Sequence, residues 1–530
     1  MTSCALCGRP EGPATLAEAG WVSPEVESRV ASAHPGWTRS QGGCPSCLQQ
    51  ALLTILLERG DAALHHSIQA VWPVDPEAAF GAIPTPLRLH ADPRFTGRDV
   101  TIAAVDSGFY PHPDLIRPSN RIRAWVDASR APVEARLFGP EEAPRWPGWD
   151  SREGRQWHGL MTTTAAVGNG FLGRGLYRSL APDASVVLVR VSEPSGRIGN
   201  DAIARALTWL LDHRSELGLR VVNLSLGGDP VSPLAGNPVD EAVAALVRDG
   251  VVVVVAAGND GRRQLVPPGT APSALTIGGI DDRNTFDHAE LELWHSNYGE
   301  TVGQVPKPEL VAPSLFVVAP VLPGTEVERE AKALFARRAA GDLSVEPRLS
   351  ELKLVTPHYQ HVEGTSFAAP LVTSVVATML EANPQLTPER VRAILMSTAE
   401  PVPAAPPERQ GAGVVVAGRA VTRALADLHG RSEEDARSPI LGPAAVHFVL
   451  HDRNARDVRV FGSWNQWQGP GLRAFPKAPG LWRAVLPRPS AGSYTYKFLV
   501  DGERWLTDAA NPARSSDGWG GYNSLFFVPG

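Results

Sequence analysis

The feature that most constrains the fold is an alternation of short apolar runs with amphipathic segments, which begins at Gly97 and ends near His429. Strands that alternate with helices of this length predict right-handed crossovers and a parallel sheet. We therefore expect an α/β domain in three layers over residues 97–429, with helices on both faces of the sheet. Four runs have the short, β-branched pattern of buried strands, namely Val100–Val105, Val186–Val191, Arg220–Leu226 and Val251–Ala257, and helical patterns between them include Asp201–His213 and Pro238–Arg248.

The rest of the 530 residues forms flanking regions, as the usual size of a domain predicts. Residues 1–60 hold all four cysteines and a helix-like stretch, Cys47–Arg59, and residues 61–96 are a proline-containing bridge. Within the central domain, the charged helical stretch Glu326–Ala340 has the character of an insertion. Residues 430–443 are polar and read as a linker.

From Ala444 onward the pattern changes to short alternating strands, which predict a small immunoglobulin-like β-sandwich over residues 444–530. Turns such as Asp501-Gly502 separate the strands. About 85 residues are enough for an independent domain. The expected strands are His447–Leu450, Val458–Phe461, Leu481–Leu486, Tyr494–Val500 and Ser524–Val528.

Charge and hydropathy exclude several classes of partner. The formal net charge of −6 provides no basic footprint for nucleic acid or an anionic membrane. The longest apolar run, Val251–Ala257, is far too short to span a bilayer. The first twenty residues have neither the basic nor the apolar part of a signal peptide. We therefore expect a soluble, cytoplasmic protein.

The cysteines form two CxxC pairs, Cys4 with Cys7 and Cys44 with Cys47. Each pair supplies two sulfurs from one tight turn, and this spacing is typical of a tetrahedral thiolate site for zinc. Such a zinc ion would be structural, because the protein fills all four positions. The alternative is two disulfides, which a reducing compartment disfavours.

Three motifs of the central domain carry nucleophilic chemistry, in the order Asp, His, Ser. Asp106 ends the first strand in Ala-Val-Asp-Ser-Gly, His158 begins His-Gly-Leu-Met-Thr, and Ser366 lies in Gly-Thr-Ser-Phe-Ala-Ala-Pro before an apolar helix. A neutral imidazole can take the proton of a serine hydroxyl, and a carboxylate can fix the tautomer of that imidazole. The carboxyl ends of parallel strands are also where ligand sites gather.

Asn259 follows the Val251–Val255 strand and completes this set. Its side-chain amide and the backbone N–H of Ser366 are candidate donors to an oxyanion. Each residue alone has a plainer explanation, since an Asp can cap a strand, an Asn can form a turn and Gly-Thr-Ser can begin a helix. Their order and their positions on one sheet favour catalysis.

These motifs resemble those of the subtilisin-like serine peptidases over roughly residues 97–429. The resemblance implies a catalytic triad of Asp106, His158 and Ser366 and an acyl-enzyme mechanism that needs no cofactor. It also implies that Ser225, Leu226 and Gly227 pair with an extended peptide substrate. Leu160 departs from the family pattern, which usually has Thr after His-Gly. Many relatives bind calcium, but the sequence offers no acidic cluster with a ligand spacing that would predict a site.

The last region resembles the glycogen-binding modules of AMP-activated protein kinase β subunits and of branching enzymes. The motifs that carry this resemblance are Phe461–Trp467 and Tyr494–Gly502. The resemblance implies that an α-glucan stacks on tryptophans and is hydrogen-bonded by a lysine and an asparagine. The matching positions are Trp467, Lys497, Trp505 and Asn523, whereas Trp464 is expected in the core.

Two functional hypotheses follow. The first is a serine endopeptidase that hydrolyses polypeptides, with flanking modules that target or regulate it. The second is a catalytically silent scaffold that binds an α-glucan or a protein through residues 444–530. The intact triad and Asn259 favour the enzyme. We also expect residues 1–96 to restrain or target the peptidase, because no inhibitory propeptide is evident in the sequence.

Overall fold

The computed structural model describes most residues of the chain. They are 2–6, 10–11, 24–43, 47–48, 51, 78–139, 142, 155–230, 236–284, 291–301, 304–402, 405–428, 438–441, 444–452, 454–478, 480–490, 492–508, 511, 514–519 and 521–528. The chain divides into two compact units. The first comprises residues 1–23, 31–49 and 73–424, and the second comprises residues 24–30, 50–72 and 425–530.

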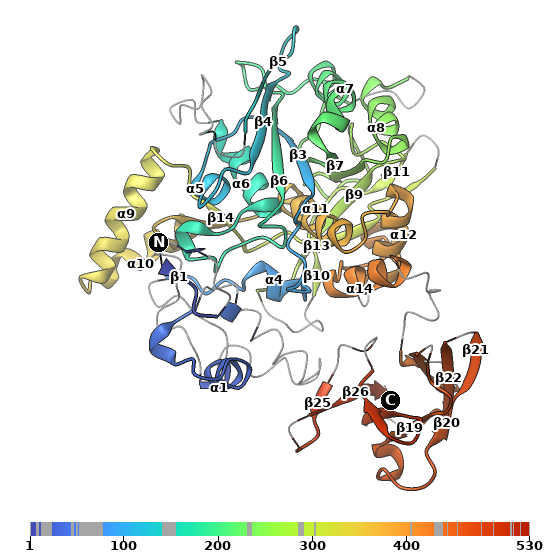
Figure 1. Cartoon of the computed structure of the whole chain (residues 1–530). Coiled ribbons are helices and arrows are strands. Elements are labelled where there is room, and N and C mark those ends of the chain that lie inside the picture. The colour runs from blue at the N-terminus through green and yellow to red at the C-terminus, as the bar shows by residue number, and fades with distance from the viewer. Residues whose placement is uncertain are drawn as a thin grey trace. The chain divides into compact units, whose positions relative to one another are not determined.

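A nine-stranded sheet forms the centre of the first unit (Figure 1). Its order is β10-β9-β8-β7-β3-β6-β4-β5, and β13 also pairs with β9. Parallel pairing joins every strand except β5 and β10, which pair antiparallel. The strands are β3 (Thr101–Asp106), β4 (Ile122–Asp127), β5 (Glu134–Leu137), β6 (Ser185–Arg190), β7 (Leu219–Leu224), β8 (Val252–Ala256), β9 (Leu275–Asp281), β10 (Glu292–Leu293) and β13 (Leu310–Pro313).

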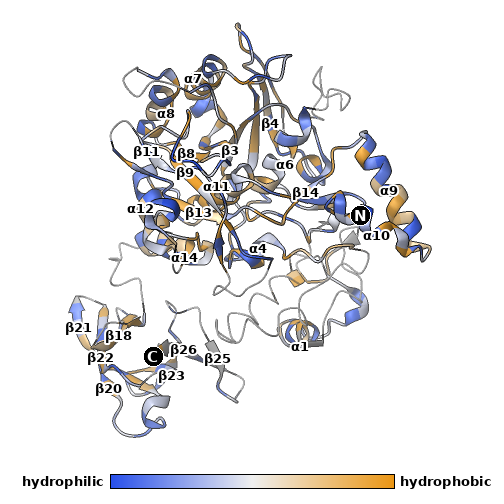
Figure 2. Ribbon diagram, turned by 180° about the vertical axis from the view of Figure 1, so that it is seen from behind, coloured by the Kyte–Doolittle hydropathy of each residue, from blue (hydrophilic) through white to orange (hydrophobic). Residues whose placement is uncertain are grey.

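Helices cover both faces of this sheet, as the alternating pattern predicts. Helices α7 (Asn200–Leu217) and α8 (Pro238–Arg248) pack against one face. Helices α6 (Gln156–Val167) and α11 (Thr365–Ala382) pack against the strands from the other side. The central strands are largely hydrophobic, whereas the outer helices carry hydrophilic stretches (Figure 2). The structure therefore has the three layers expected of a subtilisin-like α/β domain.

Side-chain alternation along the strands decides which residues meet each layer of helices. In β3, Ala103 and Val105 belong to the apolar cluster with α7 and α8. Because successive side chains of a strand point to opposite faces, Asp106 faces the layer of α6 and α11. In β7, Val222 and Leu224 pack toward α7 and α8, so Asn223 faces α11.

The charged stretch near residue 330 lies in a small insertion before α11. Helix α9 (Glu326–Ala339) begins at Thr325, whose hydroxyl accepts the backbone N–H of Glu328 at 3.3 Å. One side of the insertion buries an apolar cluster that includes Leu334, Phe335 and Leu349. The other elements here are β14 (Val317–Pro320), η8 (Leu343–Val345), α10 (Glu346–Glu351), β15 (Leu354–Thr356) and β16 (Tyr359–Val362), and the three strands pair in the order β14-β16-β15.

Short elements complete the first unit. Helix α11 has the length and composition of a membrane span, alone among the helices of the described ranges, but 89% of it is buried inside the protein. It is therefore a core helix. The remaining elements are β1 (Thr2–Ser3), β2 (Pro10–Glu11), α1 (Pro24–Ala33), η3 (Arg39–Gln41), α4 (Thr85–Arg88), α5 (Pro113–Ile116), η6 (Phe171–Gly173), β11 (Gly299–Glu300), β12 (Pro306–Lys307), α12 (Pro388–Thr398), α13 (Pro407–Gln410) and α14 (Ala417–Leu428), of which α1 belongs mostly to the second unit.

The second unit contains two antiparallel sheets that share one apolar core. The four-stranded sheet has the order β17-β18-β22-β21, and the six-stranded sheet has the order β20-β19-β23-β26-β25, with β24 paired to β23. Phe448, Tyr496 and Phe526 lie in the shared core, and Trp464 packs against it. The elements are β17 (Ile440–Leu441), β18 (Ala445–His451), β19 (Val458–Gly462), η9 (Ser463–Asn465), β20 (Leu472–Arg473), β21 (Phe475–Ala478), β22 (Leu481–Pro487), β23 (Gly492–Val500), β24 (Arg504–Leu506), β25 (Arg514–Ser516) and β26 (Tyr522–Val528).

Candidate active site

Asp106 and His158 form a hydrogen-bonded pair between β3 and α6. Asp106 is buried at the end of β3, and His158 is the third residue of α6. The Nδ1 atom of His158 lies 2.8 Å from Oδ1 and 3.0 Å from Oδ2 of Asp106. Since a carboxylate only accepts, Nδ1 carries the proton and Nε2 is left as an acceptor. This is the tautomer that a general base requires.

The close approach of α6 to β3 requires a glycine after His158. A Cβ atom on Gly159 would lie 2.1 Å from the carbonyl oxygen of Gly108 and 3.1 Å from Cβ of Asp106. Any side chain here would push α6 away from the strand. Leu160, which departs from the family pattern, is fully buried and packs in the core.

The environment of His158 raises its pKa above 6.5. Burial alone would lower this pKa, but the charge of Asp106 and the hydrogen bond to it outweigh burial. The imidazole ring also lies beside two aromatic rings, with centroid distances of 5.3 Å to Trp157 and 6.0 Å to Phe367. Phe367 directly follows Ser366, so His158 lies next to the start of α11.

Ser366 is the second residue of α11. Gly364 precedes the helix at a φ of 128°, a conformation that side chains disfavour. The hydroxyl of Ser366 donates to the carbonyl oxygen of Ser225 at 3.4 Å, and not to His158. Catalytic hydrogen bonds are often loose before substrate binds, so this contact does not exclude transfer of the hydroxyl proton to Nε2.

Pro370 explains a second contact between α11 and the end of β7. A proline has no N–H, so the carbonyl of Ser366, four residues earlier, lacks its helical donor. The hydroxyl of Ser225 donates to this carbonyl at 2.8 Å. Asn223 donates to the same hydroxyl at 3.0 Å and accepts from Thr373 at 2.9 Å. This chain of bonds attaches α11 to β7.

Thr365 fixes the side chain of Asn259. The amide oxygen of Asn259 accepts the backbone N–H of Thr365 at 3.0 Å and its hydroxyl at 2.7 Å. The NH₂ group is therefore on the free side of the carboxamide. A Cβ atom on Gly364 would lie 3.5 Å from Nδ2 of Asn259 and 3.8 Å from the backbone N of Ser366. Both candidate oxyanion donors thus border one small volume, which a side chain at Gly364 would occupy.

The segment proposed to bind peptide follows β7 without regular secondary structure. Ser225 is buried, Leu226 is half-buried and Gly227 is exposed. A Cβ atom on Gly227 would lie 2.8 Å from Val266. An exposed backbone at the carboxyl end of β7 is open to pairing with an extended chain, and a side chain at Gly227 would press on Val266.

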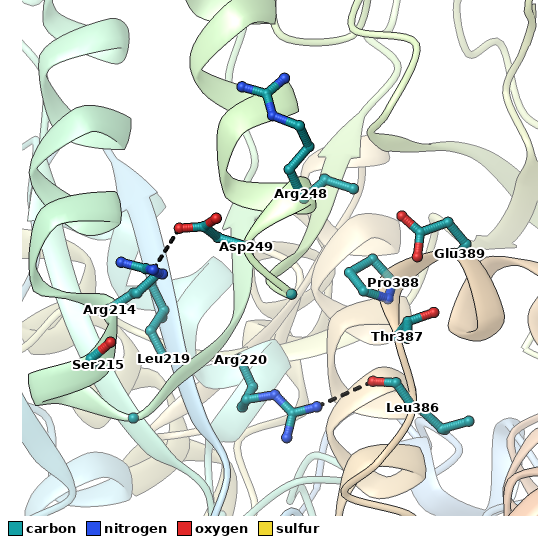
Figure 3. Close-up of a pocket in the computed structure, with 13 residues that line it drawn as sticks. Arg214, Ser215, Leu219, Arg220, Arg248, Asp249, Leu386, Thr387, Pro388 and Glu389 are labelled. Carbon is teal, nitrogen blue, oxygen red and sulfur yellow. Dashed lines mark hydrogen bonds and ion pairs between the residues drawn. The ribbon is translucent and has the colours of Figure 1, made fainter.

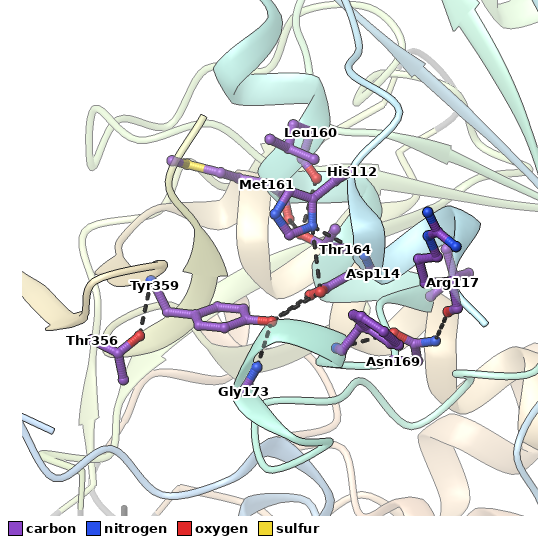
Figure 4. A network of polar contacts seen from close by, with 12 residues as sticks. His112, Asp114, Arg117, Leu160, Met161, Thr164, Asn169, Gly173, Thr356 and Tyr359 are labelled. Atoms are coloured by element: carbon purple, nitrogen blue, oxygen red, sulfur yellow. Dashed lines mark hydrogen bonds and ion pairs between the residues drawn. The ribbon is translucent and has the colours of Figure 1, made fainter. Parts of the chain in front are cut away.

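A buried network fixes the insertion to α5, the short helix that follows β3 (Figure 4). The hydroxyl of Tyr359 in β16 donates to Asp114, with distances of 2.9 and 3.0 Å to the two carboxylate oxygens, and accepts the N–H of Gly173 at 3.2 Å. Burial and the charge of Asp114 raise the pKa of Tyr359, so the phenol stays protonated as a donor. No local sequence pattern links residues so far apart in the chain.

A cavity of about 550 Å³ lies at the amino ends of strands β7 and β8 (Figure 3). Leu219 and Arg220, at the amino end of β7, and Gly250, just before β8, contribute to its wall. Arg214 and Asp249 form an ion pair of 2.6 Å there. Asp106 ends its strand, and Ser225 and Asn259 follow the carboxyl ends of theirs, so this cavity is separate from the candidate catalytic residues.

The predicted zinc ligands are only partly described. Cys4 is buried and Cys47 is half-buried. Cys7 and Cys44 lie outside the described residues, as does most of the helix predicted over residues 47–59. Across the described ranges, no three His, Cys, Asp or Glu side chains are grouped to hold a metal ion.

The predicted glucan-binding residues lie in the six-stranded sheet or next to it. Tyr496 of β23 pairs with Ser524 of the adjacent strand β26. Lys497 follows Tyr496 and Asn523 precedes Ser524, so both residues lie on the same side of this pair. The ammonium group of Lys497 forms an ion pair of 2.6 Å with Asp517. The two predicted tryptophans differ in exposure. Trp505 in β24 is 50% exposed, whereas Trp467, which follows η9 and has a φ of 63°, is half-buried.

Sequence reasoning missed the groups that orient the side chains of Asp106 and Asn259. Thr162 and Ser107 donate to Asp106, at 3.0 Å to Oδ2 and 3.1 Å to Oδ1 respectively. Thr365 orients Asn259, as described above. The contact of Thr162 could have been predicted from its position one helical turn after His158, because residues four apart share a face of a helix.

The chain was compared with known proteins. The model of the subtilase family matches residues 97–413, more than half of the chain. The serine protease AprX of Bacillus subtilis (strain 168) is 28% identical over 334 residues, which cover 62% of this chain and 67% of that protein. Subtilisin BL of Lederbergia lenta is 27% identical over 306 residues, which cover 57% of this chain and 84% of that protein. Among solved structures, sphericase is 21% identical with a TM-score of 0.43, covering 60% of this chain and 90% of that one. The chain therefore belongs to the subtilase family of serine endopeptidases.

Proposed function

We propose that Ser366, His158 and Asp106 hydrolyse peptide bonds through an acyl-enzyme. The Oγ atom of Ser366 attacks the scissile carbonyl carbon while Nε2 of His158 takes its proton. His158 then gives that proton to the leaving amine. Water, deprotonated by His158, then attacks the acyl carbon, and His158 returns the proton to Oγ of Ser366 as the ester bond breaks. Asp106 stabilises the imidazolium that forms in each half of the reaction.

The observation that carries this proposal is the pairing of His158 with both oxygens of Asp106. The paired imidazole ring lies beside Phe367, the residue after Ser366 in α11. The oxyanion would be stabilised by the N–H of Ser366 and by Nδ2 of Asn259, whose amide is held by Thr365. These donors are fixed by the backbone before the reaction, so the transition state requires no reorganisation of them.

Hydrolysis of casein by the wild type and by Ser366→Ala tests this function. The wild type is expected to cleave casein, and the variant to lose activity by several orders of magnitude. Ser107→Ala, which also removes a hydroxyl close to Asp106, is the matched control and should lose far less. A folded wild type that does not cleave casein would instead favour a silent scaffold.

We also propose that substrates bind as an extended strand along Ser225–Gly227. Backbone pairing gives affinity without demanding particular side chains. The exposed backbone of Gly227 supports this assignment. Gly227→Val should raise KM with little change in kcat, because it obstructs binding and leaves the triad in place. An unchanged KM would contradict the assignment.

A structural zinc ion is proposed at Cys4, Cys7, Cys44 and Cys47. The N–H of Leu6 donates to Sγ of Cys4 at 3.4 Å, as expected where backbone N–H groups face thiolate sulfurs. A Cβ atom on Gly43 would lie 2.7 Å from Leu6, so the two cysteine turns approach each other. Metal analysis should give one zinc per chain, lost in Cys4→Ser. If a thiol titration of the unfolded protein detects none of the four cysteine thiols, the cysteines form disulfides instead.

We further propose that the second unit binds an α-glucan or a protein through Trp467, Lys497, Trp505 and Asn523. The exposed ring of Trp505 supports this, because it lies 5.2 Å from the ring of Phe461 and extends an aromatic surface. Sedimentation with glycogen should retain the wild type and release Trp505→Ala. Phe475→Ala removes a similarly exposed ring of the other sheet and is the control. Equal retention of all three would contradict glucan binding.

Residues before the central domain are proposed to restrain or target a cytoplasmic peptidase. The segment from residue 78 onward is part of the peptidase unit, since Arg88 forms a buried ion pair with Asp282. A deletion should therefore end at residue 77 and leave this pair intact. Changed casein activity or a changed cellular fraction would support the proposal. Unchanged behaviour in both would refute it.

A further inference from the structure

Thr162 lies in α6, four residues after His158, and is 1% exposed. Residues four apart share one face of a helix, so Thr162 faces β3 together with His158. Its Oγ1 atom lies 3.0 Å from Oδ2 of Asp106 and 3.3 Å from the carbonyl oxygen of Gly159. A hydroxyl has one proton, and the nearer, charged acceptor takes it. We infer that Thr162 is a positioning residue, which holds the carboxylate of Asp106 in the plane that His158 needs.

The two oxygens of Asp106 are held from different sides. Oδ1 accepts the backbone N–H of Ser107 at 2.6 Å, so it is fixed by the strand end. Within the described part of the chain, Thr162 is the sole donor to Oδ2 apart from His158. Without this hydroxyl the carboxylate could turn about its Cβ–Cγ bond. Thr162 therefore attaches the carboxylate to the same helix that carries the imidazole.

The neighbouring threonines separate this role from general packing. Thr164 donates within the helix, to the carbonyl of Leu160 at 2.9 Å. Thr163 is equally buried, yet its hydroxyl has no hydrogen-bond partner among the residues described. Of these three consecutive threonines, Thr162 alone contacts the catalytic carboxylate. A buried valine at position 162 would fill the same space but would remove this donor to Oδ2 of Asp106.

This inference rests on the proposed triad, and it predicts two effects of Thr162→Val. The rate constant of acylation should fall about tenfold to a hundredfold, as expected for a lost hydrogen bond to a charged group. The negative charge of Asp106 should also be less dispersed. The imidazolium form of His158 is then more strongly favoured, and the acid limb of the pH–rate profile moves to higher pH.

The experiment measures the inactivation of the full chain by a fluorophosphonate from pH 5 to 9. For Thr162→Val we expect a lower kinact, an unchanged KI and an upward shift of the acid limb. Thr162→Ser, which keeps the hydroxyl, should restore both quantities toward wild type. Thr163→Val is the matched control and should behave as wild type. Thr162→Ala is assayed in parallel, so that a folding failure of the valine variant leaves the prediction open to refutation.

Two results would overturn the inference. Thr162→Val could match Thr163→Val in kinact and in the acid limb, or the serine variant could lose as much as the valine variant, which would assign the effect to the methyl group. A failure of the proposed triad is distinguishable, because Ser366→Ala would then react as fast as the wild type.

Discussion

Removal of the Asn259 amide tests how far the site is organised before substrate binds. In Asn259→Ala one of the two oxyanion donors is lost. Because Thr365 holds the amide oxygen by two bonds of 3.0 and 2.7 Å, we expect the NH₂ group to stabilise the oxyanion without prior reorientation. The full effect of a preorganised donor is therefore expected. That effect is about a hundredfold to a thousandfold in kcat, or roughly 3–4 kcal/mol, a range that comes from a subtilisin.

A second variant should give a loss of kcat between none and that of Asn259→Ala. Thr365→Val removes the 2.7 Å bond to Asn259 and the 3.1 Å bond from the N–H of Gly258, but it keeps the backbone bond to Asn259. One lost bond of this kind corresponds to about 1 kcal/mol, so kcat should fall roughly fivefold to tenfold. The two variants should thus differ by at least tenfold.

The assay is hydrolysis of an internally quenched peptide chosen from the sites at which the wild type cuts casein. We expect kcat to fall in both variants and KM to stay unchanged, because the oxyanion forms only in the transition state. Asn120→Ala is the control, since Asn120 precedes β4 at the amino end of that strand. A kcat for Asn259→Ala within twofold of wild type would refute the assignment of Asn259.

Three further predictions concern the base, the helix contact and the stability of the domain. Since His158 acts as a base only when neutral and its pKa is raised, kcat/KM should fall as pH decreases, with a midpoint above pH 6.5. A flat profile of kcat/KM from pH 5 to 8 would contradict the role of His158. Gly159→Ala should reduce kcat by about a hundredfold, because its Cβ would collide with Gly108 and displace the imidazole, and wild-type kinetics would disprove that contact. Asp282→Asn should lower the free energy of unfolding by about 3–5 kcal/mol, because the buried guanidinium of Arg88 loses its counter-charge, and urea unfolding with a loss below 1 kcal/mol would contradict this.

The sequence predicted the strands that end at or just before Asp106, Ser225 and Asn259 and the apolar helix after Ser366, because their apolar periodicity is local. The prediction for α8 has the observed bounds, Pro238–Arg248. The start of that helix is encoded locally, by the cap Asn237, which accepts the N–H of Val239 at 3.0 Å, and by Pro238 in the first turn. The strand ends differ by one or two residues, since they depend on pairing with neighbouring strands.

The contacts that orient the site could not be predicted in the same way. The bond between Thr365 and Asn259 joins residues 106 positions apart, and that between Tyr359 and Asp114 joins residues 245 positions apart. Such contacts depend on the order of strands in the sheet and on which face each side chain occupies. The ion pair of Lys497 with Asp517 was likewise invisible in the motif that suggested a sugar ligand.

The most direct test of the central claim is the site of reaction with a fluorophosphonate. We expect the folded wild type to incorporate one label per chain, and mass spectrometry of its peptides should find that label on Ser366. The Ser366→Ala variant should not react, although its thermal unfolding should match that of the wild type. Label on another residue, or equal labelling of Ser366→Ala, would contradict the assignment of Ser366 as the nucleophile.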